Sequence, residues 1–240
     1  MYGYRGKIGL LVPLVNTTLE MDFHRLIPEG VSVHTARISL DAPPESKVET
    51  LEELAINAIK AAKDVAATEV DIIVFGCTSG SFFKGITWDR EMSERIARDT
   101  RIPAITTATA GVEGLREMGI KKVSVVTPYP EEINKRLIVF LEGNGFQVMR
   151  LESLGLRDPR EFARVSPFLL YQLGKRAFVS GADGIFISCT QLRAIEILEQ
   201  LEQDIGNPVV TAVQATVWLA LKRVGLKSPV NGYGMLLKRV

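Results

Sequence analysis

The sequence predicts an α/β protein of two pseudo-symmetric, doubly wound lobes with parallel sheets. Three observations predict this fold class. Short apolar runs alternate with helical patterns along the 240 residues, which is the order of βαβ units with right-handed crossovers. The runs, such as residues 8–12 and 184–188, are apolar nearly throughout, as in parallel strands covered on both faces. The second half of the chain also repeats motifs of the first half.

The repeat is carried by three pairs of segments that keep the same order in both halves. They are "KIGLLVP" (7–13) with "KVSVVTP" (122–128), "DIIVFGCT" (71–78) with "DGIFISCT" (183–190), and "IPAITTATA" (102–110) with "NPVVTAVQA" (207–215). We expect the chain to cross between lobes where the third pair passes into helices. The first lobe is therefore predicted over residues 1–108 plus 214–240, and the second lobe over residues 109–213.

The predicted helices carry their own start signals. Residues 50–67 place a stripe of leucine, alanine and valine on one face, and Thr50 with Glu53 has the spacing of a capping box. Thr17 and Glu20 form a similar box. In the second copy, Ser166 is the expected N-cap with proline at the first helical position, and Gly181 is the expected stop. The tail over residues 225–240 has weak periodicity and stays unassigned.

Composition excludes several classes of function. The net charge is +1, with acids and bases interspersed, so no nucleic-acid or membrane partner is expected. The first apolar segment is too short for a membrane span, and we expect a cytoplasmic protein whose two cysteines are free thiols. No dinucleotide-binding or Walker motif is present. Two lone histidines, His24 and His34, and two distant cysteines make metal ligation improbable. We expect no cofactor and no metal.

Both cysteines occupy matched strand ends, and each is followed by threonine. Ligands of open α/β sheets bind beyond the carboxyl ends of the strands, so Cys77 and Cys189 are expected to face one interlobe cleft, the predicted active site. A helix N-terminus would favour the thiolate. The hydroxyls of Thr78, Ser79 and Thr190 offer donors to a carboxylate. One thiol would serve as base or nucleophile and the other as proton donor. The alternative is that both are ordinary buried cysteines of the core.

At these residues the chain resembles a known superfamily. Two lobes with "GCTSGSF" in the first and "SCTQ" in the second resemble the aspartate/glutamate racemase superfamily, whose cofactor-independent enzymes carry paired cysteines across an interlobe cleft. The segments "PLVNTTLE", "CTSGSFFKGITWDRE", "TTATAGVEGLREMGIKKVSVVTPYPEEIN" and "RVSP" resemble its branch of maleate cis-trans isomerases and arylmalonate decarboxylases. The similarity spans about the whole chain.

The resemblance implies roles for individual residues. Cys77 stands where maleate isomerases carry the nucleophilic thiol and where the decarboxylase has glycine, and Cys189 stands at the second thiol, the proton donor. Asn16 matches an asparagine that binds a substrate carboxylate. Thr78, Ser79 and Tyr129 match the hydroxyls of the decarboxylase's anion pocket. A further carboxylate-binding asparagine of maleate isomerases has no counterpart between residues 151 and 167. The alternatives there are the arginines Arg157, Arg160 and Arg164.

The resemblance therefore implies a cofactor-independent, two-cysteine isomerase of a small mono- or dicarboxylate, similar to maleate cis-trans isomerases, and we expect a homo-oligomer. Other readings stay open: an amino-acid racemase of the aspartate/glutamate type, an arylmalonate decarboxylase-like enzyme, and a small-carboxylate-binding module without activity. Phe82, Phe83 and Trp88 either line the cleft or pack beneath it.

Overall fold

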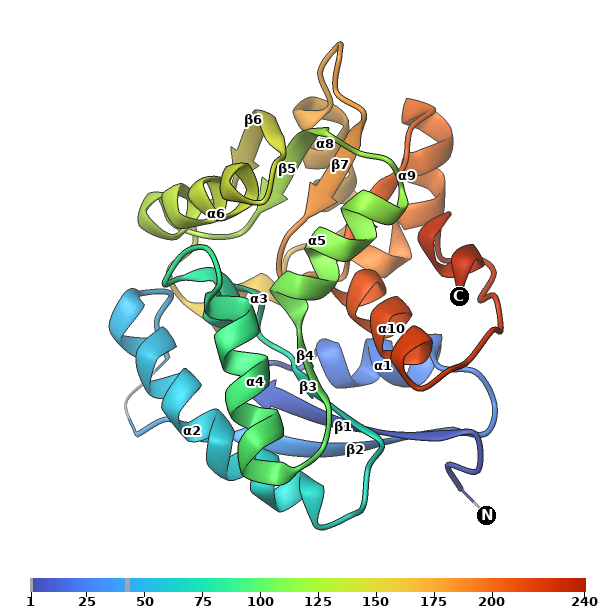
Figure 1. The fold of residues 1–240 in the computed structure, drawn as a ribbon. Helices are drawn as coiled ribbons and strands as arrows, with labels where there is room; N and C mark the ends of the chain where they lie inside the picture. The colour runs from blue at the N-terminus through green and yellow to red at the C-terminus, as the bar shows by residue number, and fades with distance from the viewer. Residues whose placement is uncertain (1, 42–43) are drawn as a thin grey trace.

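Two parallel four-stranded sheets form the framework of the computed structural model, which describes residues 2–41 and 44–240 (Figure 1). The sheets have the same strand order, β2-β1-β3-β4 in the first and β6-β5-β7-β8 in the second. Their strands are β1 (Gly6–Pro13), β2 (Val31–Ile38), β3 (Ile72–Phe75), β4 (Ala104–Thr106), β5 (Lys122–Thr127), β6 (Gln147–Ser153), β7 (Gly184–Ile187) and β8 (Val209–Thr211). The predicted pair of parallel α/β lobes is confirmed.

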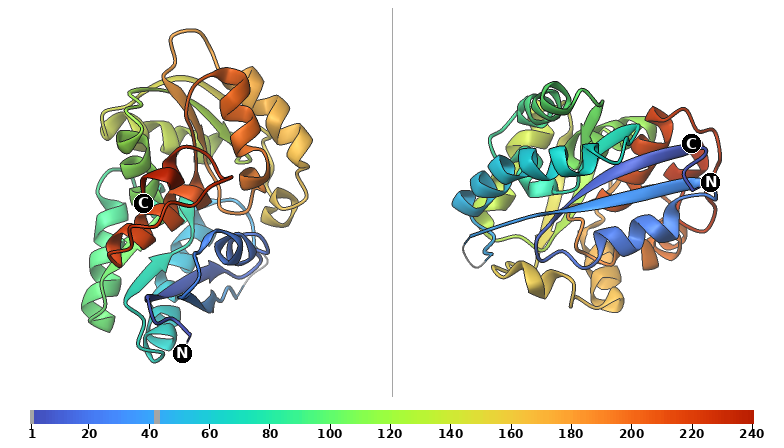
Figure 2. Two further views of the ribbon diagram at one scale, coloured as in Figure 1. Left: turned by 90° about the vertical axis from the view of Figure 1, so that its right-hand side faces the viewer. Right: turned by 90° about the horizontal axis from the view of Figure 1, so that it is seen from below.

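Helices cover both faces of each sheet, as expected for strands that are apolar on both faces. The first sheet has α2 and α4 on one face and α1 on the other (Figure 2). The helices are α1 (Leu19–Leu26), α2 (Val48–Ala66), α3 (Thr78–Phe82), α4 (Trp88–Thr100), α5 (Thr107–Glu117), α6 (Glu131–Gly143), α7 (Pro159–Phe162), α8 (Pro167–Ala177), α9 (Leu198–Ile205) and α10 (Ala212–Arg223), with the short 3-10 turns η1 (Ala194–Glu196) and η2 (Leu236–Arg239). None of the helices in the described ranges has the length and hydropathy to cross a membrane.

The strand order places the site. In each sheet the chain turns back beside the first strand, so successive helices fall on opposite faces and leave a crevice at the carboxyl ends of β1 and β3, and of β5 and β7. Cys77 follows β3 and Cys189 follows β7. The equivalent thiols of the two lobes therefore lie at equivalent crevices.

Two predicted capping boxes are wrong. Helix α2 begins at Val48 without a side-chain cap, and the Glu53 carboxylate accepts instead from the backbone N–H of Asp41, at 2.5 Å. The N-cap residue of α1 is Thr18, one residue after the predicted Thr17, and its side chain makes no cap bond; Asn16 takes that part instead. Its Oδ1 accepts from the backbone N–H groups of Thr18 and Leu19, at 3.0 Å each. In the first case the partner comes from a segment twelve residues away, and in the second a local Asn side chain replaces the predicted Thr.

The predicted start of α8 is confirmed, and its end is not. Ser166 accepts from the backbone N–H of Leu169 at 3.2 Å, with Pro167 at the first helical position. The helix ends at Ala177, because Phe178 already adopts an extended conformation (φ −69°, ψ 117°). Gly181, at φ 85°, serves the later turn into β7.

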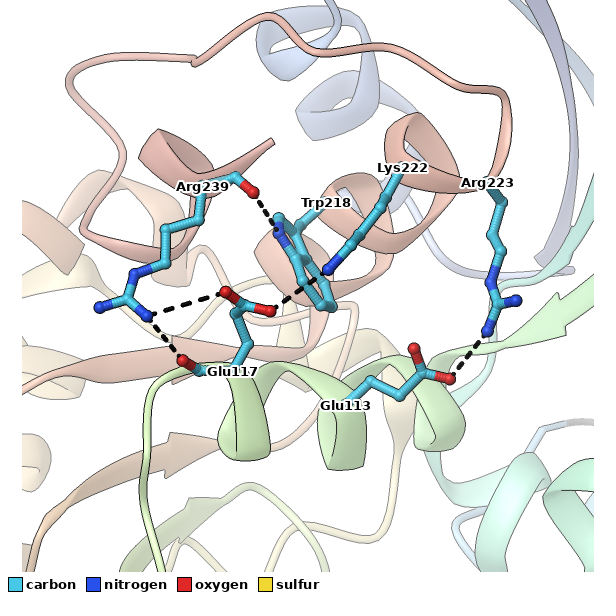
Figure 3. Close-up of polar contacts among 6 residues, drawn as sticks. All are labelled: Glu113, Glu117, Trp218, Lys222, Arg223 and Arg239. Carbon is cyan, nitrogen blue, oxygen red and sulfur yellow. Dashed lines mark hydrogen bonds and ion pairs between the residues drawn. The ribbon is translucent and has the colours of Figure 1, made fainter.

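The lobes join through α5 and α10, which lie side by side (Figure 1). The unassigned tail folds back onto this pair (Figure 3). The Glu117 carboxylate accepts from Lys222 at 3.2 Å, the Arg239 guanidinium donates to the Glu117 carbonyl at 2.7 Å, and Trp218 Nε1 donates to the Arg239 carbonyl at 3.3 Å. Arg223 adds a bond to Glu113 at 3.0 Å. The exact lobe boundaries, 1–108 plus 214–240 and 109–213, stay a prediction.

Candidate active site

Cys77 is held at the start of a helix, as predicted. It is the N-cap of α3, and its Sγ accepts from the backbone N–H of Gly80 at 3.3 Å. The Ser79 hydroxyl lies 3.8 Å from the same sulfur. These two donors point at the thiol, so they are placed to stabilise its negative charge when it ionises.

Cys189 is held differently from its counterpart. It is followed by a turn, so the expectation of a helix N-terminus directly after it is wrong. Its φ of 141° lies in a region that side-chain-bearing residues rarely adopt. Such backbone strain persists only where the surroundings hold it, and it is concentrated at functional sites. The Cys189 Sγ accepts from the backbone N–H of Gln191 at 3.4 Å.

One cavity of about 60 Å³ brings the two thiols together. All the binding residues expected from the sequence line it as well, namely Asn16, Thr78, Ser79, Tyr129 and Thr190. They come from the ends of β1, β3, β5 and β7, so both lobes contribute. Gln191, the last residue of the motif "SCTQ", also lines the cavity, although its motif alone predicted no role for it.

Several hydroxyls beside the thiols lack a partner. Thr78 Oγ1, Tyr129 Oη and Ser188 Oγ are buried and make no hydrogen bond of good geometry with other described residues, although the Tyr129 hydroxyl lies close enough to Ser188 and Cys189 to interact with both. A buried hydroxyl is costly to leave unpaired, and native structures rarely do so without a reason. Two of these hydroxyls belong to residues that line the cavity, Thr78 and Tyr129. They are donors available to an anionic ligand.

Asn16 and Thr190 connect the lobes across the cavity. Asn16 Nδ2 donates to Thr190 Oγ1 at 3.0 Å, and Thr190 Oγ1 donates to the Gly76 carbonyl at 3.1 Å. Gln191 Nε2 adds a bond to the Val15 carbonyl at 2.9 Å. Because Thr190 takes one of the two Asn16 amide hydrogens and Oδ1 accepts from Thr18 and Leu19, only the second amide hydrogen remains for a ligand.

Burial opposes ionisation of both thiols, contrary to the expectation of a favoured thiolate. It raises the pKa of Cys77, although the Gly80 N–H and the Ser79 hydroxyl act in the opposite direction. Burial, with a contribution from a negative charge on Cys77, raises the pKa of Cys189 to about 12. The pKa of Tyr129 lies well above its ordinary value for the same reasons, burial and then the neighbouring Cys189. Cys77 therefore loses its proton before Cys189 does.

The arginines considered as substitutes for the absent asparagine do not reach the cavity. Arg157, Arg160 and Arg164 are exposed and lie outside its lining. Arg160 pairs with Asp158, at 2.7 Å. Within the described part of the chain, no lysine, arginine or histidine lines the cavity.

The aromatic residues after Cys77 pack beneath the site. Phe82 and Phe83 are fully buried and do not line the cavity. The Phe82 ring contacts Tyr129 edge-on, with 6.2 Å between ring centroids. Trp88 Nε1 donates to the Gly80 carbonyl at 3.0 Å. These contacts support the position of α3 and of the Tyr129 ring.

Comparison with known proteins gives one consistent answer. The family model described as arylmalonate decarboxylase matches residues 8–237. A maleate isomerase of Geobacillus stearothermophilus is 26% identical over 96% of each chain, and an arylmalonate decarboxylase of Bordetella bronchiseptica is 29% identical over 95% of each chain. The solved structure of a maleate isomerase of Pseudomonas putida S16 with maleate has a TM-score of 0.93 and 25% identity, over 98% of each chain.

These relatives make the protein an enzyme of maleate isomerase-like type, with the decarboxylase as a related alternative. The match of the family model covers nearly the whole chain, including both cysteine motifs and most of the tail. The chain belongs to the arylmalonate decarboxylase family.

Proposed function

We propose that this enzyme isomerises a small unsaturated carboxylic acid about its double bond, without a cofactor, using Cys77 and Cys189. One observation carries the proposal. Two thiols from equivalent strand ends of the two lobes line one buried cavity, next to unpartnered hydroxyls. The names of the relatives make maleate the first substrate to test.

In the proposed reaction, the substrate carboxylate accepts from Thr78, Ser79, Tyr129 and the remaining Asn16 amide hydrogen. Cys77 first gives its proton to solvent, its thiolate forms a bond to one alkene carbon, and the π electron pair moves to the other carbon and its carboxylate. Hydrogen-bond donors held around that carboxylate stabilise the developing charge. The binding residues thus lower the barrier to addition.

Cys189 completes the sequence. Its thiol gives a proton to the carbanion, and the former double bond, now single, rotates. The Cys189 thiolate then removes a proton from the same carbon, the double bond forms again, and the bond to Cys77 breaks. Burial raises the pKa of Cys189 to about 12, so this thiol carries the proton that the reaction transfers to the carbanion. Cys77, which ionises first, suits the nucleophile.

Racemisation is the second candidate, because two thiols facing one cavity from different lobes are also suited to move an α-proton from one face to the other. Decarboxylation of the arylmalonate type has less support, because the resemblance implies that arylmalonate decarboxylase has a glycine where this chain has Cys77. We also propose that the protein is cytoplasmic, which its two free cysteines support, and that it forms a homo-oligomer. Light scattering after size-exclusion chromatography tests the oligomer.

The two thiols tested separately decide between these mechanisms. In the isomerase, Cys189→Ala accumulates a Cys77 adduct with the mass of enzyme plus substrate, and Cys77→Ala forms none. In a racemase, neither variant forms an adduct, and each exchanges the α-proton of one enantiomer in heavy water. Intact-protein mass spectrometry and NMR measure both. Full isomerase activity in Cys77→Ala would refute the nucleophilic mechanism.

A further inference from the structure

Arg37 lies outside the cavity and is bonded to one of the residues that line it. No lysine, arginine or histidine among the described residues is part of the lining. The Arg37 guanidinium nevertheless donates from Nη1 to the backbone carbonyl of Asn16, and from Nη2 to the carboxylate of Glu20 at 2.8 Å. Glu20 lies in the first turn of α1. One planar group therefore holds the chain at Asn16 and again at the start of α1.

The position of Arg37 in the sheet explains this contact. It lies near the end of β2, the edge strand of the first sheet, and pairs in register with Val12 of β1. The two strands are parallel, so the segment that follows β1 lies ahead of the Arg37 side chain. The contact therefore joins the edge strand to the segment that carries Asn16 into the cavity.

The other polar atoms of Asn16 are held as well. Its backbone N–H donates to the Pro13 carbonyl at 2.9 Å, its Oδ1 accepts the two cap bonds of α1, and its Nδ2 donates to Thr190. The bond from Arg37 fixes the remaining group, the carbonyl. The direction of the free amide hydrogen therefore depends on how firmly this peptide is held.

From these contacts we infer that Arg37 is a positioning residue for substrate binding, which acts through Asn16 by fixing the direction of its free amide hydrogen. The inference rests on the proposed function, in which that hydrogen meets a substrate carboxylate. A hydrogen bond weakens steeply when its angle is poor, so a displaced Asn16 binds the carboxylate less well. Lysine is a single-point donor and cannot replace the two-pronged contact of the guanidinium.

Succinate binding to the full chain tests the inference, because succinate has no double bond to isomerise. Arg37→Met is expected to raise the Kd of succinate, measured by calorimetry, about fivefold or more, and Arg37→Lys to give a smaller increase. Arg150→Met is the matched control. Arg150 lies on β6, the equivalent edge strand of the second sheet, is paired with Glu152 at 2.6 Å and lies outside the cavity. The two arginine side chains are similarly exposed, 41% and 44%.

The control should keep the Kd within about twofold of the wild type, since exposed ion pairs contribute little. An unchanged Kd in Arg37→Met, or an equal increase in Arg150→Met, overturns the inference. The Tm of each variant, measured without ligand, shows that the compared proteins are folded.

A double-mutant cycle tests whether Arg37 acts through Asn16. Asn16→Ala has no side-chain amide to position, although its backbone carbonyl still accepts from Arg37. Adding Arg37→Met to Asn16→Ala should therefore change the Kd less than about twofold. If Arg37→Met raises the Kd by the same factor with and without Asn16, the arginine acts by another route and the positioning role is refuted.

Salt separates positioning from attraction at a distance. The field of an exposed guanidinium is screened by salt, whereas the orientation of a bonded side chain is not. The ratio of Kd between Arg37→Met and the wild type should be equal at about 0.05 M and about 0.5 M sodium chloride. A ratio that falls to one at the higher concentration would assign the effect to charge and refute positioning.

Turnover keeps this inference distinct from the proposed function. If the wild type binds succinate and does not isomerise maleate, the proposed isomerase fails, while the Kd values still decide the role of Arg37. If the wild type isomerises maleate and the Kd of succinate is unaffected by Arg37→Met, the positioning role alone fails. A wild type that binds neither acid overturns both.

Discussion

Asn16 of the first lobe donates a hydrogen bond to Thr190 of the second lobe, with 3.0 Å between Nδ2 and Oγ1. The same asparagine caps α1, and the same threonine directly follows Cys189. This contact therefore joins the start of α1 in the first lobe to the residue that follows Cys189 in the second lobe.

Removal of the hydrogen bond between Asn16 and Thr190 should lower the stability of the fold. Asn16→Ala loses the cap and the bond, and should lower the free energy of unfolding by about 1–3 kcal/mol. Thr190→Val should cost a similar amount, and Thr190→Ser, which keeps the hydroxyl, much less. In a double-mutant cycle measured by urea unfolding, the Asn16–Thr190 coupling should exceed about 0.5 kcal/mol. Strict additivity would show that the contact contributes nothing.

Tyr129→Phe should separate binding from stability. The Tyr129 hydroxyl is buried and makes no hydrogen bond of good geometry with Ser188 or Cys189 beside it, so its removal should change the free energy of unfolding by less than about 1 kcal/mol. Binding of a carboxylate should weaken by about 1.5–3 kcal/mol, the range for a hydrogen bond to a charged group. Phe140→Leu, beneath the site, is the contrasting control, because it should destabilise the fold. Wild-type affinity in Tyr129→Phe would remove this hydroxyl from the site.

The buried thiols should react slowly at neutral pH. Because burial raises the pKa of Cys77, its alkylation by iodoacetamide should be slower than that of free cysteine at pH 7 and should increase with pH beyond 9. Cys189, with a pKa of about 12, should react later than Cys77. Peptide mass spectrometry over a pH series assigns each site. Rapid alkylation of both thiols at pH 7 would contradict the burial that the structure shows.

A buried carboxylate outside the site should make stability depend on pH. Asp22 is 4% exposed and its Oδ2 has no described partner. Burial raises its pKa to about 7, with Glu196 adding to the shift and Arg25 and Arg193 opposing it. A raised folded-state pKa stabilises the protein fully below the unfolded value, and that contribution is lost as pH rises through about 7.

Asp22→Asn removes this titration. The free energy of unfolding of the wild type, relative to the variant, should fall by a few kcal/mol between about pH 4 and pH 8, measured by urea unfolding. Asp64→Asn, at an exposed position of α2, is the matched control and should follow the wild type. Parallel profiles for Asp22→Asn and wild type would mean that the carboxylate is not held in a protonated state.

Local patterns in the sequence were enough to predict two similar lobes, their strands, and the equivalent positions of Cys77 and Cys189. A run such as 184–188 is apolar on both faces whatever its neighbours are, and the Ser166 cap depends on a backbone group only three residues away. The positions of Cys77 and Cys189 after equivalent strands follow from the repeat, because equivalent strand ends of similar lobes carry equivalent crevices.

Contacts between distant segments decided the rest. Thr50 and Glu53 have the spacing of a capping box, yet the Glu53 carboxylate accepts a hydrogen bond from the backbone N–H of Asp41 instead. The thiol pKa values follow from burial between two lobes, which outweighs the local donors around each sulfur. The lining of the cavity joins Leu54 to Phe162, and the exposed arginines Arg157, Arg160 and Arg164 are not part of it. Which side chains share a cavity depends on how the lobes pack, and no local spacing in the sequence encodes that packing.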